Sequence, residues 1–517
     1  MSGGETYYIT TPIYYVNDKP HIGHAYTTLA CDVLARFKRL GGTEVKFLTG
    51  TDEHGQKVEK SALAAGLSPQ ALVDANSANF RDLASHIGAS NDDFIRTTEP
   101  RHIAACQDLW RRLIEGGHIY LGHYEGWYSV RDEAFYGSDE VTTGPSGDKV
   151  GPTGAPVEWV KEPSYFFRLS AWQDRLLAYY EANPDCIAPQ SRRNEVISFV
   201  KRGLQDVSVS RTSFSWGIPV PNDPDHIMYV WLDALTNYIA ALGFPRQDGD
   251  YARFWPADLH MVGKDILRFH AVYWPAFLLA ADLEPPKRIF AHGWWTNEGQ
   301  KISKSLGNVI DPLTLIAKYG LDQVRYFLLR ELPFGNDGDF SHRAMVSRMN
   351  SDLANDYGNL AQRVLSMIGK NCGGKVPQAG PLIDADEALL AGAYGMLAKV
   401  REALDQQLFH EGLETIWTVI RAANAYVDHQ APWALKKSDP ARMETVLWVL
   451  AETVRLLALM TLAYMPDASA RLLDQLAVAT DKRDFSAFRP EDALAAGVVL
   501  PSPAGVFPRY VDAEGEG

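Results

Sequence analysis

The first fifty residues place a helix between two short strands, and no other feature of the sequence restricts the possible folds as strongly. Residues 7–10 are β-prone, and residues 25–40 carry apolar side chains at helical spacing. Gly41 and Gly42 end this helix, and residues 45–49 form a second apolar strand pattern. A strand, a helix and a strand in this order make a βαβ unit, which predicts an α/β fold built on a Rossmann-type parallel sheet.

The alternation is interrupted and then returns further along the chain. From about residue 116, short β-prone pieces at 124–128 and 157–160 flank the Gly- and Pro-rich run 142–156, which indicates an inserted domain. The strand and helix patterns return at residues 227–235, 259–263, 265–280 and 288–295. We therefore predict one sheet that is completed in two halves around an insertion.

Beyond about residue 343, strand patterns nearly vanish and helical periodicity dominates. Long helical patterns occupy residues 345–368, 385–408, 411–429 and 442–464. They predict an α-helical bundle in the last third of the chain. Residues 501–517 contain prolines and acids and are predicted to form a loosely packed tail.

The composition excludes several classes of protein. The chain has 517 residues, and 46% of them are apolar, which is typical of a globular protein and excludes global disorder. The longest nearly uninterrupted apolar stretch, 271–281, is far shorter than the roughly 18–20 residues of a membrane span. Residues 1–6 have no basic region followed by an apolar one, so we expect no signal peptide and a cytoplasmic location.

Charge and cysteine content narrow the possible partners. The formal net charge of −14 argues against sequence-independent coating of nucleic acid, although a local basic face is compatible with RNA binding. The four cysteines lie far apart and form no CxxC pair. We therefore expect reduced thiols, with neither a disulfide framework nor a thiolate zinc site.

Two histidines lie between the first strand and its helix, in the tetrapeptide His21-Ile22-Gly23-His24. Imidazoles three residues apart at a helix N-terminus share one face, where unsatisfied N–H groups and the positive end of the dipole favour an anion such as a triphosphate. Gly23 has no Cβ, so an adenine ring or a ribose can lie against the backbone there. The alternative is two histidines in a turn, one capping a carbonyl and one in solvent.

Two lysines flank small hydroxyl residues in the loop Lys301-Ile302-Ser303-Lys304-Ser305. Mobile ammonium groups on such a loop make charge-assisted contacts with phosphates and stabilise the negative charge on a pentacoordinate phosphorus. Taken alone, a loop of this kind is more often a solvated turn. Its position about 280 residues after the histidine pair, where the sheet pattern has returned, favours the phosphate-binding interpretation.

The two motifs resemble the HIGH and KMSKS signatures of class I aminoacyl-tRNA synthetases, with Ile302 where a methionine is usual. The residues around them are most similar to the methionyl members of that family. The segments that carry this resemblance are residues 11–17, 50–55, 229–235, 263–266 and 269–270. Their order extends the resemblance over nearly the whole chain.

The resemblance implies a division of the chain into a catalytic domain, a connective insertion and an anticodon-binding helical bundle. The two halves of the catalytic domain are predicted at residues 1–115 and 226–290, on either side of the insertion at 116–225. The region of the KMSKS loop and of stem contacts follows at 291–345, the anticodon-binding domain at 346–500 and the tail at 501–517.

The resemblance also implies roles for single residues. His21, His24, Lys301 and Lys304 would be catalytic, and together with Gly23 and Ser303 they would bind ATP. Asp52, at the end of a strand, would pair with the α-ammonium group of methionine. The residues implied to hold the methionine as well are Pro12, Ile13, Tyr15, Trp231, Ala234, Leu235, Tyr238, Ile266, His270 and Trp274. Aromatic rings suit a polarizable thioether, although each ring taken alone is equally a residue of an ordinary core.

Two further matches concern RNA. Asn359 and Arg363 share one face of a predicted helix, and Pro432 and Trp433 follow a helix break. Amide and guanidinium groups combined with an indole read unstacked bases, and the resemblance implies that these four residues read the CAU anticodon. The alternative is a buried tryptophan at a helix kink.

The implied activity is a ligase reaction. L-Methionine is activated by ATP with Mg²⁺ to methionyl-adenylate, with release of pyrophosphate, and methionine is then transferred to the 3′-terminal adenosine of tRNA(Met), with release of AMP. Many relatives carry CxxC zinc knuckles in the insertion, whereas residues 126–133 contain no cysteine, so no structural zinc is expected. Because the chain ends soon after the bundle, we expect a monomer.

Three alternatives use parts of the same pattern. A synthetase for another aliphatic amino acid shares both signatures, but it normally needs a longer insertion for editing. A small-molecule nucleotidyltransferase shares the histidine turn and has no use for the helical bundle. A non-catalytic RNA-binding protein descended from a synthetase is expected to lose His21, His24, Asp52 or Lys304, and all four are present.

Overall fold

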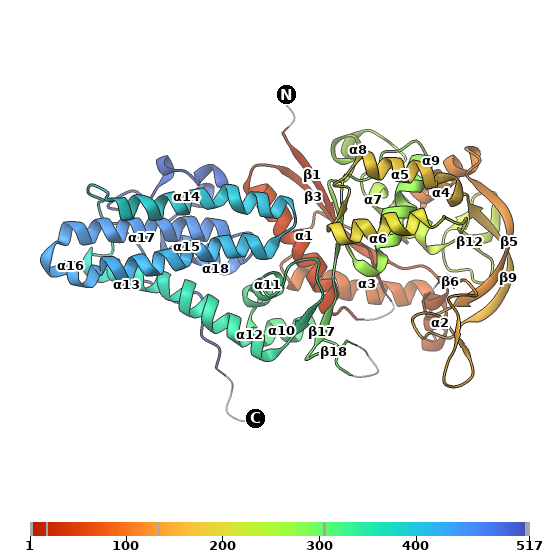
Figure 1. Ribbon diagram of the computed structural model, residues 1–517, viewed down its shortest axis with the longest axis horizontal. Coiled ribbons are helices and arrows are strands. Elements are labelled where there is room, and N and C mark those ends of the chain that lie inside the picture. The colour runs from red at the N-terminus through yellow and green to blue at the C-terminus, as the bar shows by residue number, and fades with distance from the viewer. Residues whose placement is uncertain (1–3, 17–18, 133, 303–306, 512–517) are drawn as a thin grey trace. The chain divides into compact units, whose positions relative to one another are not determined.

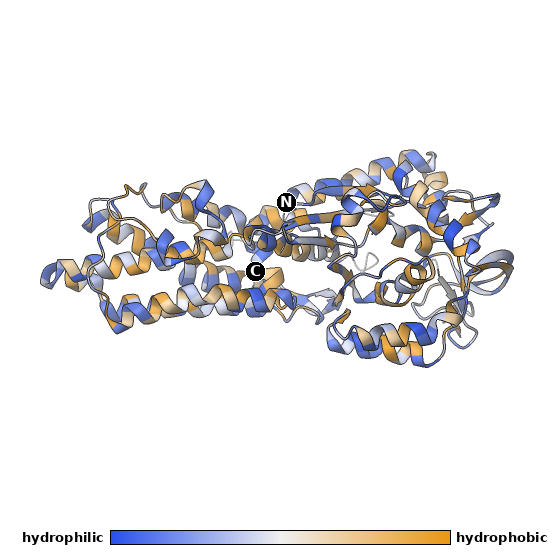
Figure 2. Ribbon diagram, turned by 90° about the horizontal axis from the view of Figure 1, so that it is seen from above, coloured by the Kyte–Doolittle hydropathy of each residue, from blue (hydrophilic) through white to orange (hydrophobic). Residues whose placement is uncertain are grey.

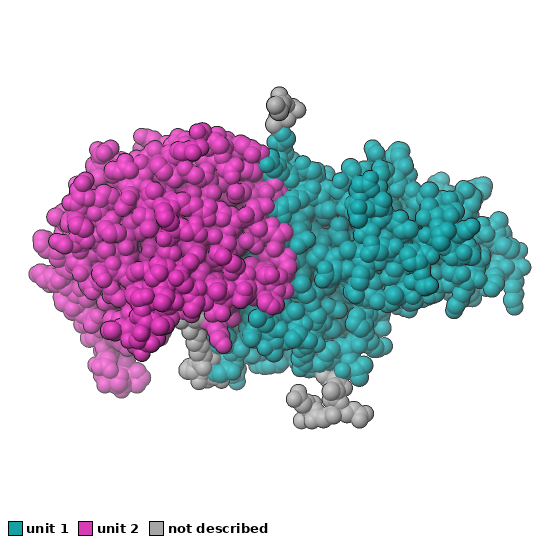
Figure 3. All heavy atoms as spheres, turned by 180° about the vertical axis from the view of Figure 1, so that it is seen from behind, with its two compact units in different colours: residues 1–5, 21–44, 293–517 teal, residues 6–20, 45–292 magenta. Residues whose placement is uncertain are grey.

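The computed structural model describes residues 4–16, 19–132, 134–302 and 307–511. Contacts divide the chain into two compact units (Figure 3). Unit 1 consists of Met1–Glu5, His21–Glu44 and Gly293–Gly517, and unit 2 consists of Thr6–Pro20 and Val45–His292. The histidine motif and the lysine motif thus belong to unit 1, and the residues implied to bind methionine belong to unit 2.

Unit 2 is built on a seven-stranded sheet with the order β10-β16-β15-β1-β3-β2, in which β4 also pairs with β3 (Figure 1). The strands are β1 (Thr6–Thr10), β2 (Tyr14–Tyr15), β3 (Glu44–Asp52), β4 (Asp93–Arg96), β10 (Ile187–Ala188), β15 (Leu259–Gly263) and β16 (Ile289–His292). β1 pairs in parallel with β15, β15 with β16, and both β2 and β4 with β3. The last six residues of β3 are all buried, as expected for a parallel strand that is covered on both faces. The prediction of a parallel sheet is confirmed.

Helices surround this sheet within unit 2. They are α2 (Gln56–Ala65), α3 (Pro69–His86), α4 (Pro100–Glu115), η1 (Leu169–Trp172), α5 (Gln173–Ala182), α6 (Gln190–Lys201), α7 (Val230–Ala240), α8 (Gly249–Phe254), η2 (Lys264–Ile266), η3 (Phe269–Tyr273) and α9 (Trp274–Ala280). Helices α4 and α7 pack against each other, and α7 also packs against η3 and α9. The largest buried apolar cluster of the unit lies among these elements.

The insertion is dominated by the long antiparallel pair β5 (Ile119–Ser129) and β9 (Glu158–Phe167). The smaller strands of this region are β6 (Ala134–Tyr136), β7 (Thr142–Thr143), β8 (Lys149–Val150) and β11 (Val207–Ser208). Rings pack across the β5–β9 pair, with Trp127 edge-on to Trp159 at 5.3 Å and Tyr120 stacked on Phe166 at 5.7 Å between ring centroids. Aromatic packing therefore stabilises the insertion.

Two strands near the insertion pair differently from the sequence pattern. Ile187 and Ala188 of β10 lie inside the predicted insertion, but they pair in parallel with β16 of the main sheet. In contrast, β14 (Asp223–Met228), which coincides with the start of the 227–235 pattern, pairs antiparallel with β12 (Ser210–Arg211) and β13 (Pro219–Val220) in a separate sheet. Strand pairing over such distances in sequence depends on the tertiary fold, which local periodicity does not encode.

Unit 1 contains α1 (Ile22–Leu40), a small sheet and the helical bundle. The sheet joins β17 (Trp295–Asn297) to β18 (Gln300–Lys301) and β19 (Gly338–Phe340). The helices that follow are α10 (Pro312–Tyr319), α11 (Leu321–Arg330), α12 (His342–Ser347), η5 (Arg348–Gly358), α13 (Asn359–Asn371), α14 (Asp384–Asp405), α15 (Phe409–Gln430), α16 (Pro432–Ser438), α17 (Pro440–Thr461) and α18 (Pro466–Gln475). Short 3₁₀ turns end the chain at Thr480–Lys482, Phe485–Ala487 and Pro490–Asp492.

The bundle is confirmed, with α14, α15 and α17 packed against one another. Figure 2 shows hydrophobic and hydrophilic residues alternating along these helices, which is the pattern of helices with one buried face. The single helix predicted at residues 345–368 is instead α12, a π-helix (η5) and α13 in succession. Among the described residues, no helix is long and apolar enough to cross a lipid bilayer.

Candidate active site

The histidine motif caps its own helix. His21 is the N-cap of α1, and its Nδ1 accepts a hydrogen bond from the backbone N–H of Gly23 at 3.1 Å. The Nδ1 of His24 accepts one from the backbone N–H of His21 at 3.0 Å, so the two imidazoles form a capping box. The two ring centroids lie 3.9 Å apart. The alternative of one histidine capping a carbonyl and one in solvent is wrong, because both rings accept from backbone N–H groups and neither is exposed.

The caps determine the protonation of both rings. Because each Nδ1 accepts a hydrogen bond, the proton of each neutral imidazole is on Nε2. Burial, reinforced by the neighbouring His21 ring, lowers the pKa of His24 well below its ordinary value. The N-terminus of α1 thus offers neutral Nε2–H donors beside the positive end of the helix dipole, which suits the oxygens of a phosphate chain.

Gly23 is required by the cap itself. A Cβ at this position would lie 2.9 Å from Cε1 of His21, a distance at which the imidazole has to move. The space above Gly23 was predicted to serve a nucleotide, and the structure adds that the same space holds His21 in its capping position.

The segments that flank the lysine motif lie against α1 and β17. β17 and β18 form a hairpin whose turn residues, Glu298 and Gly299, both have positive φ, as expected for a type I′ turn. On the other side of the motif, the carbonyl of Ile310 accepts a hydrogen bond from the backbone N–H of Ile22 at 3.0 Å. Within unit 1, Ile310, which follows the motif in the sequence, therefore lies at the N-terminus of α1. Lys301 lies on β18, but its side chain, Ser303 and Lys304 lie outside the described residues.

Helix α1 is held in unit 1 by a buried ion pair. Asp32 on α1 accepts a hydrogen bond from Arg325 on α11 at 2.7 Å, and neither side chain is exposed. Arg325 also donates to the carbonyls of Ala463 and Tyr464. Removing one partner of such a pair is strongly destabilising, so the pair fixes the position of α1.

In unit 2, Asp52 and three other residues implied to bind methionine lie at the carboxyl end of the sheet. Asp52 is the last residue of β3, is buried and is the parallel partner of Tyr15 on β2. Pro12 is buried and Ile13 half-buried in the connection between β1 and β2. Ligands bind at this edge in open α/β sheets.

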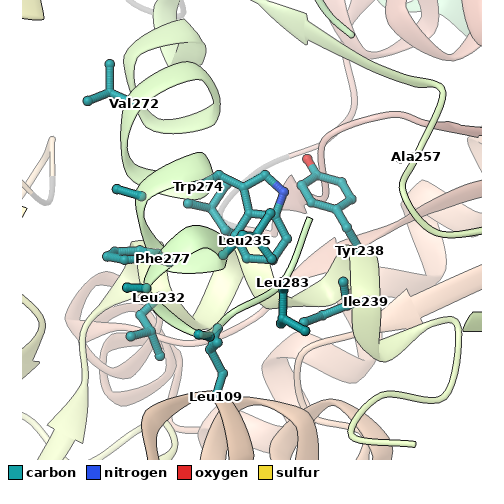
Figure 4. Close-up of a cluster of buried hydrophobic side chains, with 14 of the residues drawn as sticks. Leu109, Leu232, Leu235, Tyr238, Ile239, Ala257, Val272, Trp274, Phe277 and Leu283 are labelled. Atoms are coloured by element: carbon teal, nitrogen blue, oxygen red, sulfur yellow. The ribbon is translucent and has the colours of Figure 1, made fainter. Parts of the chain in front are cut away.

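The remaining implied residues come from α7 and from the segment between β15 and α9. Ala234, Leu235 and Tyr238 are buried on α7, while Trp231 at its start is half-buried and stacks on Phe269 at 3.5 Å between ring centroids. Figure 4 shows Leu235, Tyr238 and Trp274 in one buried cluster. Their common position supports a side-chain pocket, although the same residues also form the core of unit 2.

His270 on η3 connects this segment to Tyr238 on α7. Its Nδ1 donates to the carbonyl of Ile266 at 2.9 Å, so its Nε2 accepts the hydrogen bond from the hydroxyl of Tyr238 at 2.7 Å. Burial lowers the pKa of His270 to about 4, and the hydrogen bond to Ile266 opposes the shift only in part. His270 is therefore neutral at physiological pH and presents no charge to an apolar side chain.

The helix that carries His270 and Trp274 is not the continuous α-helix predicted at 265–280. It consists of the 3₁₀ turn η2, the π-helix η3 and α9. Pro275 has no N–H to donate to the carbonyl of Ala271, and the buried hydroxyl of Tyr180 donates to that carbonyl at 2.6 Å instead. The i, i+4 relation expected for His270 and Trp274 therefore spans a π turn, a distortion that is frequent at functional sites.

A second polar network in this region had no assigned role in the sequence. Trp274 Nε1 donates to His260 Nε2 at 3.3 Å, and the Nδ1 of His260 lies 2.8 Å from the hydroxyl of Thr10. Nearby, the carboxylate of Asp233 lies 2.6 Å from His54 and 2.7 Å from His102. In the sequence, these residues are recognisable only as polar residues within apolar stretches, as Asp233 is in α7. That pattern does not show which residues they bind.

The residues implied to read RNA lie together at one end of the bundle. Asn359 begins α13 and is exposed, and Arg363 one turn later lies with its guanidinium carbon 5.9 Å from the ring centroid of Trp433. Asp428 accepts a hydrogen bond from Arg363 at 3.1 Å. Pro432 is the first residue of α16, after Ala431 in the left-handed region, and Trp433 is 52% exposed. The alternative of a buried tryptophan is wrong.

Comparison with known proteins agrees with this arrangement. Residues 7–365 match the family model described as tRNA synthetases class I (M), and residues 376–517 match the anticodon binding domain of methionyl tRNA ligase. The methionine–tRNA ligase of Mesorhizobium japonicum is 58% identical over 511 residues, which cover 99% of each chain. That of Rhizobium meliloti is 57% identical over 515 residues, which cover 99% of this chain and all of that protein.

Solved structures show the same relationship in three dimensions. The structure of Mycobacterium tuberculosis methionyl-tRNA synthetase in complex with methionyl-adenylate matches with a TM-score of 0.95 and 54% identity, covering 98% of this chain and 100% of that chain. The free form of the same enzyme matches with a TM-score of 0.90 and 51% identity over 99% of both chains. The chain therefore belongs to the methionyl-tRNA synthetases, the methionine–tRNA ligases of class I.

Proposed function

We propose that this ligase activates L-methionine with ATP and transfers it to tRNA(Met) through the residues described above. The observation that supports the proposal is the buried cluster of unit 2, where the carboxylate of Asp52 lies at the end of a sheet strand and the hydroxyl of Tyr238 is hydrogen-bonded to the neutral ring of His270. The relative of known structure that covers 98% of this chain holds methionyl-adenylate.

Methionine recognition follows from the polarity of this pocket. Asp52 binds the α-ammonium group, Pro12 contacts the methionine, and Ile13 and Tyr15 help to enclose its side chain. Trp231, Ala234, Leu235, Ile266 and Trp274 surround the thioether, whose polarizable sulfur makes favourable contacts with aromatic rings. A shorter aliphatic side chain leaves part of this volume unfilled, which costs binding free energy of about 1–3 kcal/mol per missing methylene.

We assign the phosphate chemistry to residues of unit 1. The methionine carboxylate attacks the α-phosphorus of ATP in line, and negative charge grows on the phosphate oxygens. His21 and His24 donate from Nε2 to these oxygens beside the N-terminus of α1, and Gly23 keeps His21 in place. Lys301, Ser303 and Lys304 add charge-assisted contacts, and Mg²⁺ accompanies ATP and the leaving pyrophosphate. No covalent intermediate with the protein is needed.

We assign recognition of tRNA(Met) to the helical bundle. We assign anticodon reading to Asn359, Arg363, Pro432 and Trp433, because an exposed indole next to a guanidinium and an amide provides both stacking and hydrogen bonding for unstacked bases. The 3′-terminal ribose hydroxyl of the bound tRNA then attacks the activated carbonyl, and AMP leaves.

We further propose that the protein acts as a monomer and contains no structural zinc. Cys106 and Cys186 are buried, and burial raises the pKa of the Cys186 thiol to about 11. Zinc binds the thiolate, so such thiols are poor ligands. Elemental analysis of the purified protein should find less than one zinc per ten chains, and its mass in solution should be that of one chain.

The first test is exchange of labelled pyrophosphate into ATP, run with each of the twenty amino acids and without tRNA. We expect exchange with methionine at a rate at least about 100-fold above that with valine, leucine or isoleucine. Exchange driven by one of the branched amino acids would contradict the pocket assignment.

A further inference from the structure

Asp233 sits on the pocket helix α7, but its carboxylate binds groups from two other segments. Its Oδ2 accepts a hydrogen bond from His54 Nδ1 at 2.6 Å, and its Oδ1 accepts one from His102 Nε2 at 2.7 Å. His54 follows the end of β3, whereas His102 lies on α4. All three side chains are buried, and Asp233 is only 1% exposed.

This cluster is a hydrogen-bonded network and not a metal site. Cys106 lies near the same groups, with its Sγ 3.2 Å from His102 Nε2, so His102, Cys106 and Asp233 have the residue types of metal ligands. Two ligands of one tetrahedral zinc, however, lie roughly 3.3 Å apart or more, given zinc–nitrogen and zinc–oxygen distances of about 2.0–2.1 Å. The contact of 2.7 Å between His102 and Asp233 is too short for this.

The network keeps a charged carboxylate in the interior. Burial alone raises the pKa of Asp233, but the two imidazoles more than offset it and lower the pKa to about 2. Loss of one partner would leave a buried carboxylate oxygen without a hydrogen bond, which lowers the free energy of unfolding. Each hydrogen bond in the cluster is therefore favoured.

The network fixes the segment that follows Asp52. His54 lies two residues after Asp52, and its ring is also edge-on to Trp216 at 5.6 Å between centroids. Trp216 donates from Nε1 to the carbonyl of Glu53 at 2.6 Å and accepts at its own carbonyl from the N–H of Gly55. Residues 53–55 are thus clamped on one side by Trp216 and on the other by Asp233.

The same network connects this segment to the pocket wall. Asp233 is flanked on α7 by Trp231 and by Ala234 and Leu235, which are assigned to the methionine side chain. The distance between the ammonium-binding end and the thioether-binding wall therefore depends on the contact between Asp233 and His54.

We propose that Asp233, through His54, is a positioning residue for methionine recognition that holds the Asp52 carboxylate at the correct place relative to α7. The inference rests on the proposed function of this pocket and goes beyond it, because Asp233 acts through another residue and does not itself touch the amino acid.

The test is D233N in methionine-dependent pyrophosphate exchange. The amide keeps the volume of the carboxylate but turns one acceptor into a donor that faces an imidazole N–H. We expect the KM for methionine to rise about tenfold or more, because a shift of about 1 Å in a positioning group has effects up to 100-fold. The KM for ATP should stay within about twofold of the wild-type value. A general loss of folded protein does not raise one KM and leave the other unchanged.

A matched control is E452Q. Glu452 is also completely buried and accepts hydrogen bonds from Arg455 and Tyr394, but it lies on α17 in unit 1. This variant should unfold at a lower denaturant concentration and leave the KM for methionine unchanged. If both variants raise that KM equally, the effect of D233N is general destabilisation and the proposal is wrong.

The His54 position provides a second test. The amide of asparagine places a donor near the position of imidazole Nδ1, so H54N should recover most of the methionine affinity that H54A loses. In a double-mutant cycle, D233N should add little to the KM of D52N, because the ammonium contact it positions is already gone. Additive effects, or equal KM values for H54N and H54A, would overturn the proposal.

These measurements test the ligase function and the positioning role of Asp233 separately. If the wild-type protein shows no methionine-dependent exchange, the proposed function fails. If D52N raises the KM for methionine and D233N does not, the function stands and the positioning role of Asp233 is refuted.

Discussion

At the scale of single residues, burial decides the chemical state of the groups around methionine. His270 donates from Nδ1 to a backbone carbonyl and accepts at Nε2 from Tyr238, an arrangement that exists only for the neutral ring. Protonation would turn Nε2 into a donor, so the oxygen of Tyr238 would have to accept from it and the phenol proton would lose this acceptor. If His270 lines the methionine site as proposed, it presents an uncharged ring to the thioether.

This state predicts a pH dependence of stability. His270 has a pKa of about 4 in the folded protein against an ordinary value of 6.5, so the unfolded chain binds the extra proton between these values. The free energy of unfolding should fall as the pH drops through this window, by about 2 kcal/mol between pH 7 and pH 5 from this residue. Urea unfolding of the wild type and of H270Q at both pH values measures the effect.

In H270Q the fall in stability should be smaller by about that amount. His24, whose pKa burial also lowers, contributes equally to both proteins and cancels in the comparison. The pKa of His260 is lowered by burial and by the neighbouring His270, so the replacement of His270 relieves part of that shift and acts in the same direction. If the free energy of unfolding depends on pH in the same way in both proteins, protonation of His270 does not destabilise the folded protein and the prediction is wrong.

At the scale of elements, helix α1 shows how a short motif serves both structure and chemistry. Its N-terminus has no acidic residue in the first turn, and two imidazoles make the capping contacts that Ser, Asp or Glu usually make. Each Nδ1 satisfies a backbone N–H, which leaves Nε2–H as the donor for an anion. Gly23 allows this geometry because it has no Cβ.

We expect G23A to displace His21 and to lower kcat/KM for ATP about tenfold or more in pyrophosphate exchange. Methionine binding measured by equilibrium dialysis without ATP should not change, because the methionine pocket belongs to unit 2. A matched control is G395A on α14, where an added Cβ meets no atom within 4 Å. Alanine also favours the helix, so this variant should keep full activity. Equal losses in G23A and G395A would contradict the role of the cap.

At the scale of the whole molecule, the residues proposed to bind methionine and those proposed to read RNA belong to different units. The pocket residues assigned to methionine lie in unit 2, whereas Asn359, Arg363 and Trp433 lie at one end of the bundle in unit 1. Trp433 is a large, half-exposed apolar side chain whose exposure costs free energy in water. An exposed indole of this kind is available for stacking on a base, as proposed above.

This separation predicts that W433A affects one step only. Loss of base stacking of about 1–3 kcal/mol should raise the KM for tRNA(Met) roughly 5- to 150-fold in aminoacylation assays. Pyrophosphate exchange without tRNA should proceed at the wild-type rate, and W433F, which keeps an aromatic face, should lose less affinity for tRNA. A parallel loss of exchange activity in W433A would show that the bundle supports the chemistry directly.

The sequence by itself determined the features that depend on neighbours along the chain. Helical periodicity located α1, α14, α15 and α17, because a helix buries residues three and four apart. The two motifs predict phosphate chemistry at residues 21–24 and 301–305. The relation of the chain to its family followed from the same short segments.

Only the tertiary structure decided which distant groups meet. In the π turn that contains His270, the carbonyl of Ala271 accepts a hydrogen bond from Tyr180, 91 residues away. Asp233 is hydrogen-bonded to two histidines that are 179 and 131 residues away. The two-residue strand β10 has too little periodicity to reveal that it joins β16. Buried polar groups must find partners wherever the fold places them, and that requirement acts through space and leaves no periodic trace in the sequence.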